Sequence, residues 1–429
     1  MEAREFVMHV GGSVHDSPPA RSAQERLLTT EAPVYRNPTV FILGAGASWH
    51  YGYQTGEALI DSIFKSADQL INDCYRLQSI APSPLPTFVS ALCFDEHPAP
   101  DSSFRSVIDR CEGLLKRLRA NKPLVIDYFL GRNPALQPLG RLLIAYTLFK
   151  REAEVHFARQ RPRTVTANSL QTPPPIPWRN PNRRIHLDTN DVSIGGNDDW
   201  IRFIASHLCD DCIEPHDLNN NRVSFITFNY DTSFESELER SLSAIEFFEK
   251  DDAIKSFMDG RVTHVYGKLG KPGDDEFYSY LFPPNQDVEP WKLRKLWDAI
   301  LLLSSDIRAI EPVDKDANEA LIKQAQEQIR AAECVYILGF GFDKNNCKRI
   351  GLPSAFSATP DMPVKRIYFT NFENRNVINK RAGRTMQVRD QIFFPDNFVR
   401  VERQYHPDRY IEKSVRDVYQ ALAMDFDME

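Results

Sequence analysis

The fold of this chain is decided by the stretch Val40-Phe41-Ile42-Leu43-Gly44-Ala45-Gly46-Ala47-Ser48. An apolar run that ends in a glycine-containing turn is typical of a buried strand in a parallel sheet. The glycines let the backbone approach a ligand closely, and N–H groups near a helix start can bind a diphosphate. A tight strand–helix turn also needs glycine without any ligand, and the full G-x-G-x-x-G spacing of dehydrogenases is absent.

Further apolar segments repeat this pattern of a strand that ends in a polar or glycine-containing turn. They are Val223–Phe228, Val262–Tyr266, Val335–Leu338 and Ile367–Phe369. Segments with helical periodicity lie between them, so the sequence predicts an α/β fold with a mainly parallel sheet. Ligands of such sheets bind at the carboxyl ends of the strands, which is where the distinctive residues of this chain fall.

The helices are expected between these strands. One begins near Thr55, whose hydroxyl is expected to cap the first turn, and the others are about 103–120, about 137–158, Trp200–Leu208, Ala317–Ala332 and Ile411–Met424. Residues 77–101 are rich in proline and small polar residues and are expected to be irregular. Residues 159–197 are rich in proline and arginine, which indicates a long insertion without a core of its own.

The composition limits the class of protein. The chain has 429 residues, a formal net charge of −7 and 42% hydrophobic residues, which is ordinary for a globular protein. The mild acidity argues against a surface wholly devoted to nucleic acid. The arginines of 159–184 could contact DNA phosphates, but in an exposed loop we expect them to be solvated. No apolar run is long enough for a membrane span, and the first residues contain no apolar signal core. The seven cysteines are an odd number in a large chain without a secretion signal, which indicates reduced thiols in a cytoplasmic protein.

Two strand ends carry side chains suited to chemistry. Asn229 and Asp231 follow one strand and can both point toward a ligand, although a turn that caps the next helix would also use them. His264 ends a later strand, 35 residues after Asn229. A lone histidine is more often structural, but histidine titrates near neutrality and can serve as a general base.

Several motifs occur together and in order along residues 38–375. They are Gly44-Ala45-Gly46-Ala47-Ser48, Gly52 with Thr55-Gly56, Ile126-Asp127-Tyr128-Phe129-Leu130, Phe225-Ile226-Thr227-Phe228-Asn229-Tyr230-Asp231, His264-Val265-Tyr266-Gly267 and Leu338-Gly339-Phe340-Gly341-Phe342-Asp343. In this combination the chain resembles the sirtuin-like domain of bacterial anti-phage defence proteins.

The resemblance implies a Rossmann-like NAD-binding fold with a helical subdomain, and an enzyme that cleaves the nicotinamide–ribose bond and depletes NAD. Asn229 and His264 fall on the two catalytic positions of the family, and Gly44–Ser48 falls on its diphosphate and ribose contacts. NAD is then the substrate, and further contacts to it are expected from Thr55, Phe228, Asp231, Gly339, Gly341 and Asn371.

Residues 1–36 are polar and show no sustained periodicity, so they are expected to form a flexible tail. The resemblance suggests that 37–380 is the catalytic domain, with its helical subdomain at about 57–215, and that 381–429 is an extension packed on that domain. Related effectors lead us to expect a homo-oligomer and a HerA-type DNA-translocating ATPase as partner.

Two other functions stay open at this point. The chain could be a non-catalytic nucleotide-binding subunit that regulates or scaffolds a defence complex. Protein deacylation is a weaker alternative, because deacylases of this fold carry two Cys-x-x-Cys pairs and this chain has only Cys209-Asp210-Asp211-Cys212. A local zinc site at that pair is conceivable, but we expect no metal.

Overall fold

The computed structural model describes residues 35–80, 84–93, 100–123, 125–160, 200–210, 212–245, 252–271, 289–308, 315–355, 365–370 and 376–386. Most of the expected N-terminal tail, insertion 159–197 beyond residue 160, Asn371 and the helix expected at Ile411–Met424 lie outside these residues.

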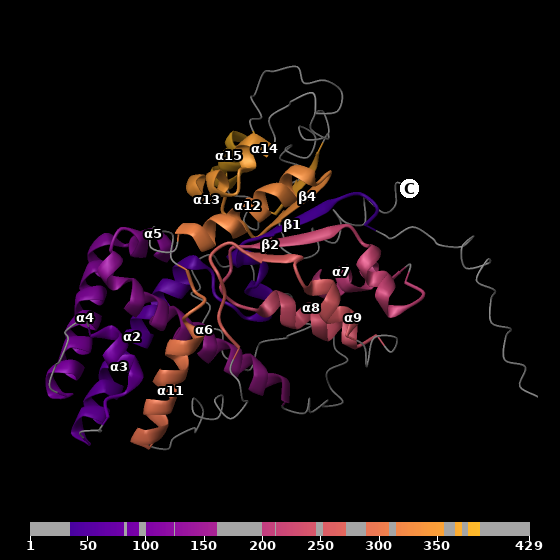
Figure 1. The fold of residues 1–429 in the computed structure, drawn as a ribbon. Helices are drawn as coiled ribbons and strands as arrows, with labels where there is room; N and C mark the ends of the chain where they lie inside the picture. Colours follow the sequence, from indigo (N-terminus) through magenta and orange to yellow (C-terminus); the bar gives the residue numbers. More distant parts are fainter. Residues whose placement is uncertain are drawn as a thin grey trace, which may run out of the picture.

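The centre of the molecule is a parallel sheet of five strands (Figure 1). The strands are β1 (Thr39–Leu43), β2 (Val223–Thr227), β3 (Val262–His264), β4 (Cys334–Leu338) and β5 (Arg366–Phe369). They lie in the order β3-β2-β1-β4-β5, and all four neighbouring pairs are parallel. This is the order of a Rossmann-like sheet, so the predicted fold class and all five predicted strands are confirmed.

The central strand β1 is buried on both faces because its residues alternate between two apolar clusters. Val40 and Ile42 belong to one cluster, and Phe41 and Leu43 belong to the other. The ring of Phe41 stacks on Tyr336 of the neighbouring strand, with 4.8 Å between ring centroids. A strand that is buried at every position therefore needs a layer of helices on each face.

Helices supply both layers. One apolar cluster takes side chains from α2 (Gly56–Ser79), α3 (Thr87–Leu92), α4 (Pro100–Asn121), α5 (Ile126–Gly131), α6 (Gln137–Gln160), α11 (Pro290–Leu303), α12 (Lys315–Ala331), α13 (Lys344–Arg349), α14 (Leu352–Ala355) and α15 (Asn376–Thr385). The other takes them from α7 (Trp200–Cys209), α8 (Ser233–Ser243) and α9 (Ala253–Met258). The 3₁₀ turns are η1 (Ala45–Ala47), η2 (Trp49–Tyr51), η3 (Pro134–Leu136) and η4 (Pro215–Asn220).

Helices α2, α3, α4, α5, α6 and α11 form a group at one end of the sheet (Figure 1). Trp297 of α11 is fully buried there and stacks on Tyr146 of α6, with ring centroids 4.5 Å apart. Its indole N–H donates to Asp73 of α2 at 2.9 Å. Helix α11, which comes late in the chain, thus completes this helical group. Helices α7 and α8 pack together in the other apolar cluster, on the opposite face of the sheet.

Two local predictions are corrected. Residues 77–101 are not irregular throughout, because α2 runs to Ser79 and α3 spans Thr87–Leu92. The prolines of this segment hid a short helix whose Phe88 and Leu92 are buried against the helical group. Helix α2 begins at Gly56 as expected, but the exposed Thr55 side chain makes no capping hydrogen bond.

The strand order reverses between β1 and β4, and the loops that follow these two strands pack backbone against backbone. Gly46 N–H donates to the Gly339 carbonyl at 3.0 Å. A Cβ on Gly44 would lie 2.5 Å from the Gly339 oxygen, and one on Gly339 would lie 2.1 Å from the Ala47 nitrogen. Gly339 also has φ +59°, a left-handed conformation that favours glycine. These glycines are therefore required by the contact between the two loops.

A substitution at this contact tests its importance. Gly339→Ala should lower the free energy of unfolding by about 2–5 kcal/mol, since it combines left-handed strain with overpacking. Gly341→Ala is the matched control, because a Cβ there meets no atom within 4 Å. Urea unfolding of the two variants measures the difference. Equal stabilities would show that the loops separate at little cost.

Candidate active site

The side chain of Asn229 connects the loop after β2 to the loop after β1 by hydrogen bonds. Its side-chain nitrogen donates to the Gly44 carbonyl at 3.1 Å and to the Ser48 hydroxyl at 2.8 Å. A backbone carbonyl only accepts hydrogen bonds, so the amide nitrogen must face Gly44. The side-chain oxygen of Asn229 is then directed away from that carbonyl. The residue is 8% exposed.

Asp231 extends this network to the start of α8. Its Oδ1 accepts from the Ser48 hydroxyl at 3.1 Å and from the Ser233 N–H at 3.2 Å, and the Ser233 hydroxyl donates to it as well. Burial raises the pKa of the Asp231 carboxyl, and these donors offset part of that rise. Ser48, predicted as a contact of the substrate, is thus shared by Asn229, Asp231 and Ser233.

The glycine loop itself is held by its own backbone. The N–H groups of Gly44, Gly46, Ala47 and Ser48 donate to the carbonyls of Leu338, Gly339, Gly44 and Gly46. Those four donors are already engaged within the protein. The loop Gly44–Ser48 therefore forms a fixed wall at the carboxyl end of β1, and its shape does not rely on a ligand.

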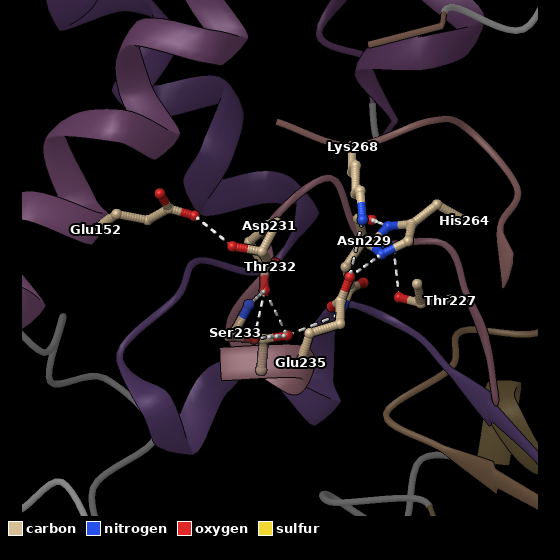
Figure 2. Close-up of polar contacts among 10 residues, drawn as sticks. Glu152, Thr227, Asn229, Asp231, Thr232, Ser233, Glu235, His264 and Lys268 are labelled. Carbon is tan, nitrogen blue, oxygen red and sulfur yellow. Dashed lines mark hydrogen bonds and ion pairs between the residues drawn. The ribbon is translucent and has the colours of Figure 1, made fainter. Parts of the chain in front are cut away.

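His264 lies beside Asn229 because their strands are neighbours in the sheet. The register pairs Thr227 with His264, so the residues just after β2 meet the end of β3. His264 Nδ1 is 3.1 Å from the Asn229 backbone oxygen. Asn229 and His264 are 35 positions apart in the sequence and yet in direct contact, as Figure 2 shows.

The other ring nitrogen of His264 contacts Glu235, in the first turn of α8. The distance from Nε2 to Glu235 Oε1 is 2.7 Å, and Lys268 Nζ is 3.4 Å from the same oxygen (Figure 2). Burial alone would raise the pKa of the Glu235 carboxyl, but His264 and Lys268 outweigh it and hold that pKa below its usual range. Among the described residues, Glu235 Oε2 is buried without a hydrogen-bond partner.

Helix α6 brings a third acid, the half-buried Glu152, to the site. Glu152 accepts a hydrogen bond from the Thr232 hydroxyl at 3.1 Å (Figure 2). Burial and the nearby charge of Asp231 raise the pKa of Glu152 to about 8. At neutral pH this carboxyl is therefore mostly protonated, which ties the helical group to the loop after β2 without adding a full negative charge.

The remaining predicted contacts of the substrate lie in different surroundings. Phe228 is half-buried in an aromatic cluster, with its ring centroid 4.9 Å from that of Phe340. Gly341 has open space where a side chain would be, whereas Gly339 is packed against the glycine loop. Thr55 is exposed. Asn371 lies outside the described residues.

Three tyrosines connect α5 and α13 to the site loops. Tyr230 donates to Asp127 of α5, Tyr128 of α5 donates to Asp343, and Tyr266 donates to Asn346 of α13. Asp343 in turn caps α13 by accepting from two of its N–H groups. This tyrosine network connects α5, α13 and the loops after β2 and β3.

Sequence analysis missed several residues of the site. Glu235 could have been found, because it lies one helical turn after Asp231 and an acid in a first turn is a common cue. Ser233 lies in the same run. Glu152 gave no such signal, since α6 approaches the site only through the packing of the helical group.

Two features bear on metals and membranes. Cys212 Sγ donates to the Leu208 carbonyl at the end of α7. Within the described residues, no cluster of three His, Cys, Asp or Glu side chains is arranged to hold a metal ion. Within the same residues, no helix combines the length and the hydropathy needed to span a membrane.

The chain matches no family model, no curated protein and no solved structure. The site offers a backbone wall, an amide oxygen at Asn229, and a histidine paired with a carboxylate, all at the carboxyl edge of the sheet where Rossmann-like folds bind nucleotides.

The buried Asp127 should make stability depend on pH. Burial raises its pKa from 3.8 to about 7, with Arg349 offsetting part of the rise. Between these values the folded chain holds a proton that the unfolded chain lacks, so stability falls as the pH rises from about 4 to 7. Asp127→Asn should remove this loss, which amounts to at most ~4 kcal/mol.

Urea unfolding at pH 5 and pH 7.5 measures this effect in the wild type and in Asp127→Asn. Asp61→Asn, at an exposed position of α2, is the matched control. A stability difference between wild type and Asp127→Asn that does not change with pH would contradict a proton on Asp127.

Proposed function

We propose that this protein is an NAD-cleaving enzyme that releases nicotinamide and serves as an effector of bacterial anti-phage defence. One observation carries the proposal. Asn229 and His264, the two residues expected to act on the substrate, are in contact through the Asn229 backbone oxygen at the carboxyl edge of a Rossmann-like sheet, beside the Gly44–Ser48 loop. Such an edge, next to the point where the strand order reverses, is where this fold binds dinucleotides.

The chemistry of the bond supports the same proposal. The nicotinamide of NAD is cationic and leaves as a neutral molecule, so the site needs little acid assistance. It must hold the ribose, tolerate positive charge that develops on the sugar, and deliver a water. The Asn229 side-chain oxygen can accept from a ribose hydroxyl or that water without adding charge. His264 can accept a proton once its nitrogen is free.

The rest of the substrate would lie along the two loops that meet at the switch point. In this proposal the diphosphate and ribose lie against the fixed wall of the Gly44–Ser48 loop, and the open space at Gly341 receives the adenosine half. Asp231 can balance positive charge or bind the carboxamide. We extend the proposal to a cytoplasmic homo-oligomer whose activity is controlled by assembly, with a HerA-type ATPase as partner.

One observation favours a different function. Both ring nitrogens of His264 are engaged within the protein, by Asn229 and Glu235. A site in that state suits a nucleotide-binding subunit that regulates or scaffolds a complex without cleaving NAD. Nicotinamide release by the purified wild-type protein separates the two functions.

Substitution of the two central residues tests the catalytic proposal. Asn229→Ala and His264→Ala should each reduce nicotinamide release by about 100-fold or more, the range that a positioned polar or acid–base group contributes. Asn220→Ala and His216→Ala, both at exposed positions of η4, are matched controls that should retain full activity. The thermal melting of each variant is measured alongside. Folded variants at either site residue with wild-type rates would remove that residue from the mechanism.

Metal removal gives an independent test. Cleavage should survive EDTA, because a leaving group that departs neutral requires no Lewis acid. Chromatographic assay of nicotinamide with and without the chelator is sufficient. Loss of activity that added zinc restores would overturn this and direct attention to Cys209 and Cys212.

A further inference from the structure

The environment of His264 determines how many protons its ring carries. Nδ1 faces the Asn229 backbone oxygen at 3.1 Å. A carbonyl oxygen can only accept a hydrogen bond, so Nδ1 must hold a proton. A neutral ring would then have its lone pair on Nε2, which is the nitrogen available for taking a proton from a substrate.

Nε2, however, faces Glu235 Oε1 at 2.7 Å. A hydrogen bond of this length needs one proton between Nε2 and Oε1. The attraction between the two side chains, which helps to hold the pKa of Glu235 below its usual range, favours that proton on Nε2. Both ring nitrogens are then engaged, and the ring is fixed at two points.

The charges around this pair act in opposite directions. Lys268 lies 3.4 Å from Glu235 Oε1 and competes with His264 for its negative charge. Asp231 and Glu152 are the acidic groups whose charges interact with Glu235 from the loop after β2 and from α6. Glu235 Oε2 has no hydrogen-bond partner among the described residues. The charge of the carboxylate is compensated mainly by His264, with Lys268 and a backbone hydrogen bond adding to it.

We propose that Glu235 is a positioning residue that fixes the His264 ring and keeps Nε2 protonated in the resting site. The ring then becomes a base only after it loses this proton and its contact with Glu235. This inference rests on the proposed function for its meaning in catalysis, but the pairing itself is a property of the protein without substrate.

Two substitutions should move the ring titration of His264 in opposite directions. Glu235→Gln removes the negative partner, so the ring should lose its proton at a pH lower by about one unit or more. Lys268→Gln removes the competing cation from a half-exposed position, so the ring should hold its proton to higher pH. Glu235→Asp keeps the charge and should restore most of the wild-type behaviour. Glu239→Gln, on the exposed face of the same helix, should change nothing.

The experiment is an NMR titration of the histidine ring protons of the full chain without NAD. The His264 signal is identified among the ten histidines by its loss in His264→Gln. Opposite shifts in Glu235→Gln and Lys268→Gln support the proposal, and a midpoint that is the same in both variants overturns it. Lys268→Gln changes a partly exposed side chain, so it tests the pairing even if Glu235→Gln does not fold.

Enzyme kinetics then separate this proposal from the proposed function. The acidic limb of the kcat profile should move with the ring titration, while the KM for NAD changes little. Ring shifts as expected without nicotinamide release from any variant would uphold the pairing and refute the NAD-cleaving enzyme. Nicotinamide release, together with the same His264 titration midpoint in Glu235→Gln and Lys268→Gln, would support the NAD-cleaving enzyme and refute the role of Glu235.

Discussion

The close approach of two backbones, the Gly44–Ser48 loop and Gly339, is the constraint on which the rest of the site depends. It lies where the strand order reverses, between β1 and β4. A Cβ atom at Gly44 or Gly339 would fall within 2.5 Å of opposing backbone atoms. The two loops can therefore approach this closely only because both positions are glycine. Because the loop is set by this contact, its Gly44 carbonyl and Ser48 hydroxyl are in place to receive Asn229.

A chain of polar contacts then extends from that loop across the carboxyl edge of the sheet. Asn229 links the loop to β2, and its own backbone oxygen receives His264 at the end of β3. Glu235 holds the far side of the ring. Every step joins a different element, which is why the site can be rigid although it is built from loops. The proposed function and the proposed role of Glu235 both derive from this one chain of contacts.

Much of the fold could be predicted because its signals are local. The five strands are short apolar runs, and each ends in a turn that is visible in the sequence. The contact between Asn229 and His264 also follows from local signals, since two neighbouring parallel strands bring their carboxyl ends to one edge. Helix α3 was missed because prolines surround it and only burial of Phe88 and Leu92 against the helical group stabilises it.

Interactions between distant elements could not be predicted. Glu152 and Asp127 come from the helical group, and their approach to the loop after β2 depends on how α5 and α6 pack. The raised pKa of each carboxyl is a consequence of that burial. Likewise, the glycines of the two loops were expected to make room for a substrate, whereas Gly44 and Gly339 make room for each other.

The central claim is that NAD binds at the edge formed by these loops. Amide hydrogen exchange with an NAD analogue that resists cleavage of the nicotinamide–ribose bond tests it most directly. The account predicts new protection in peptides that cover residues 44–56, 228–235, 264–268 and 339–343, and little change in α4 or α9. Protection confined to other parts of the chain, or none at saturating analogue, would contradict it.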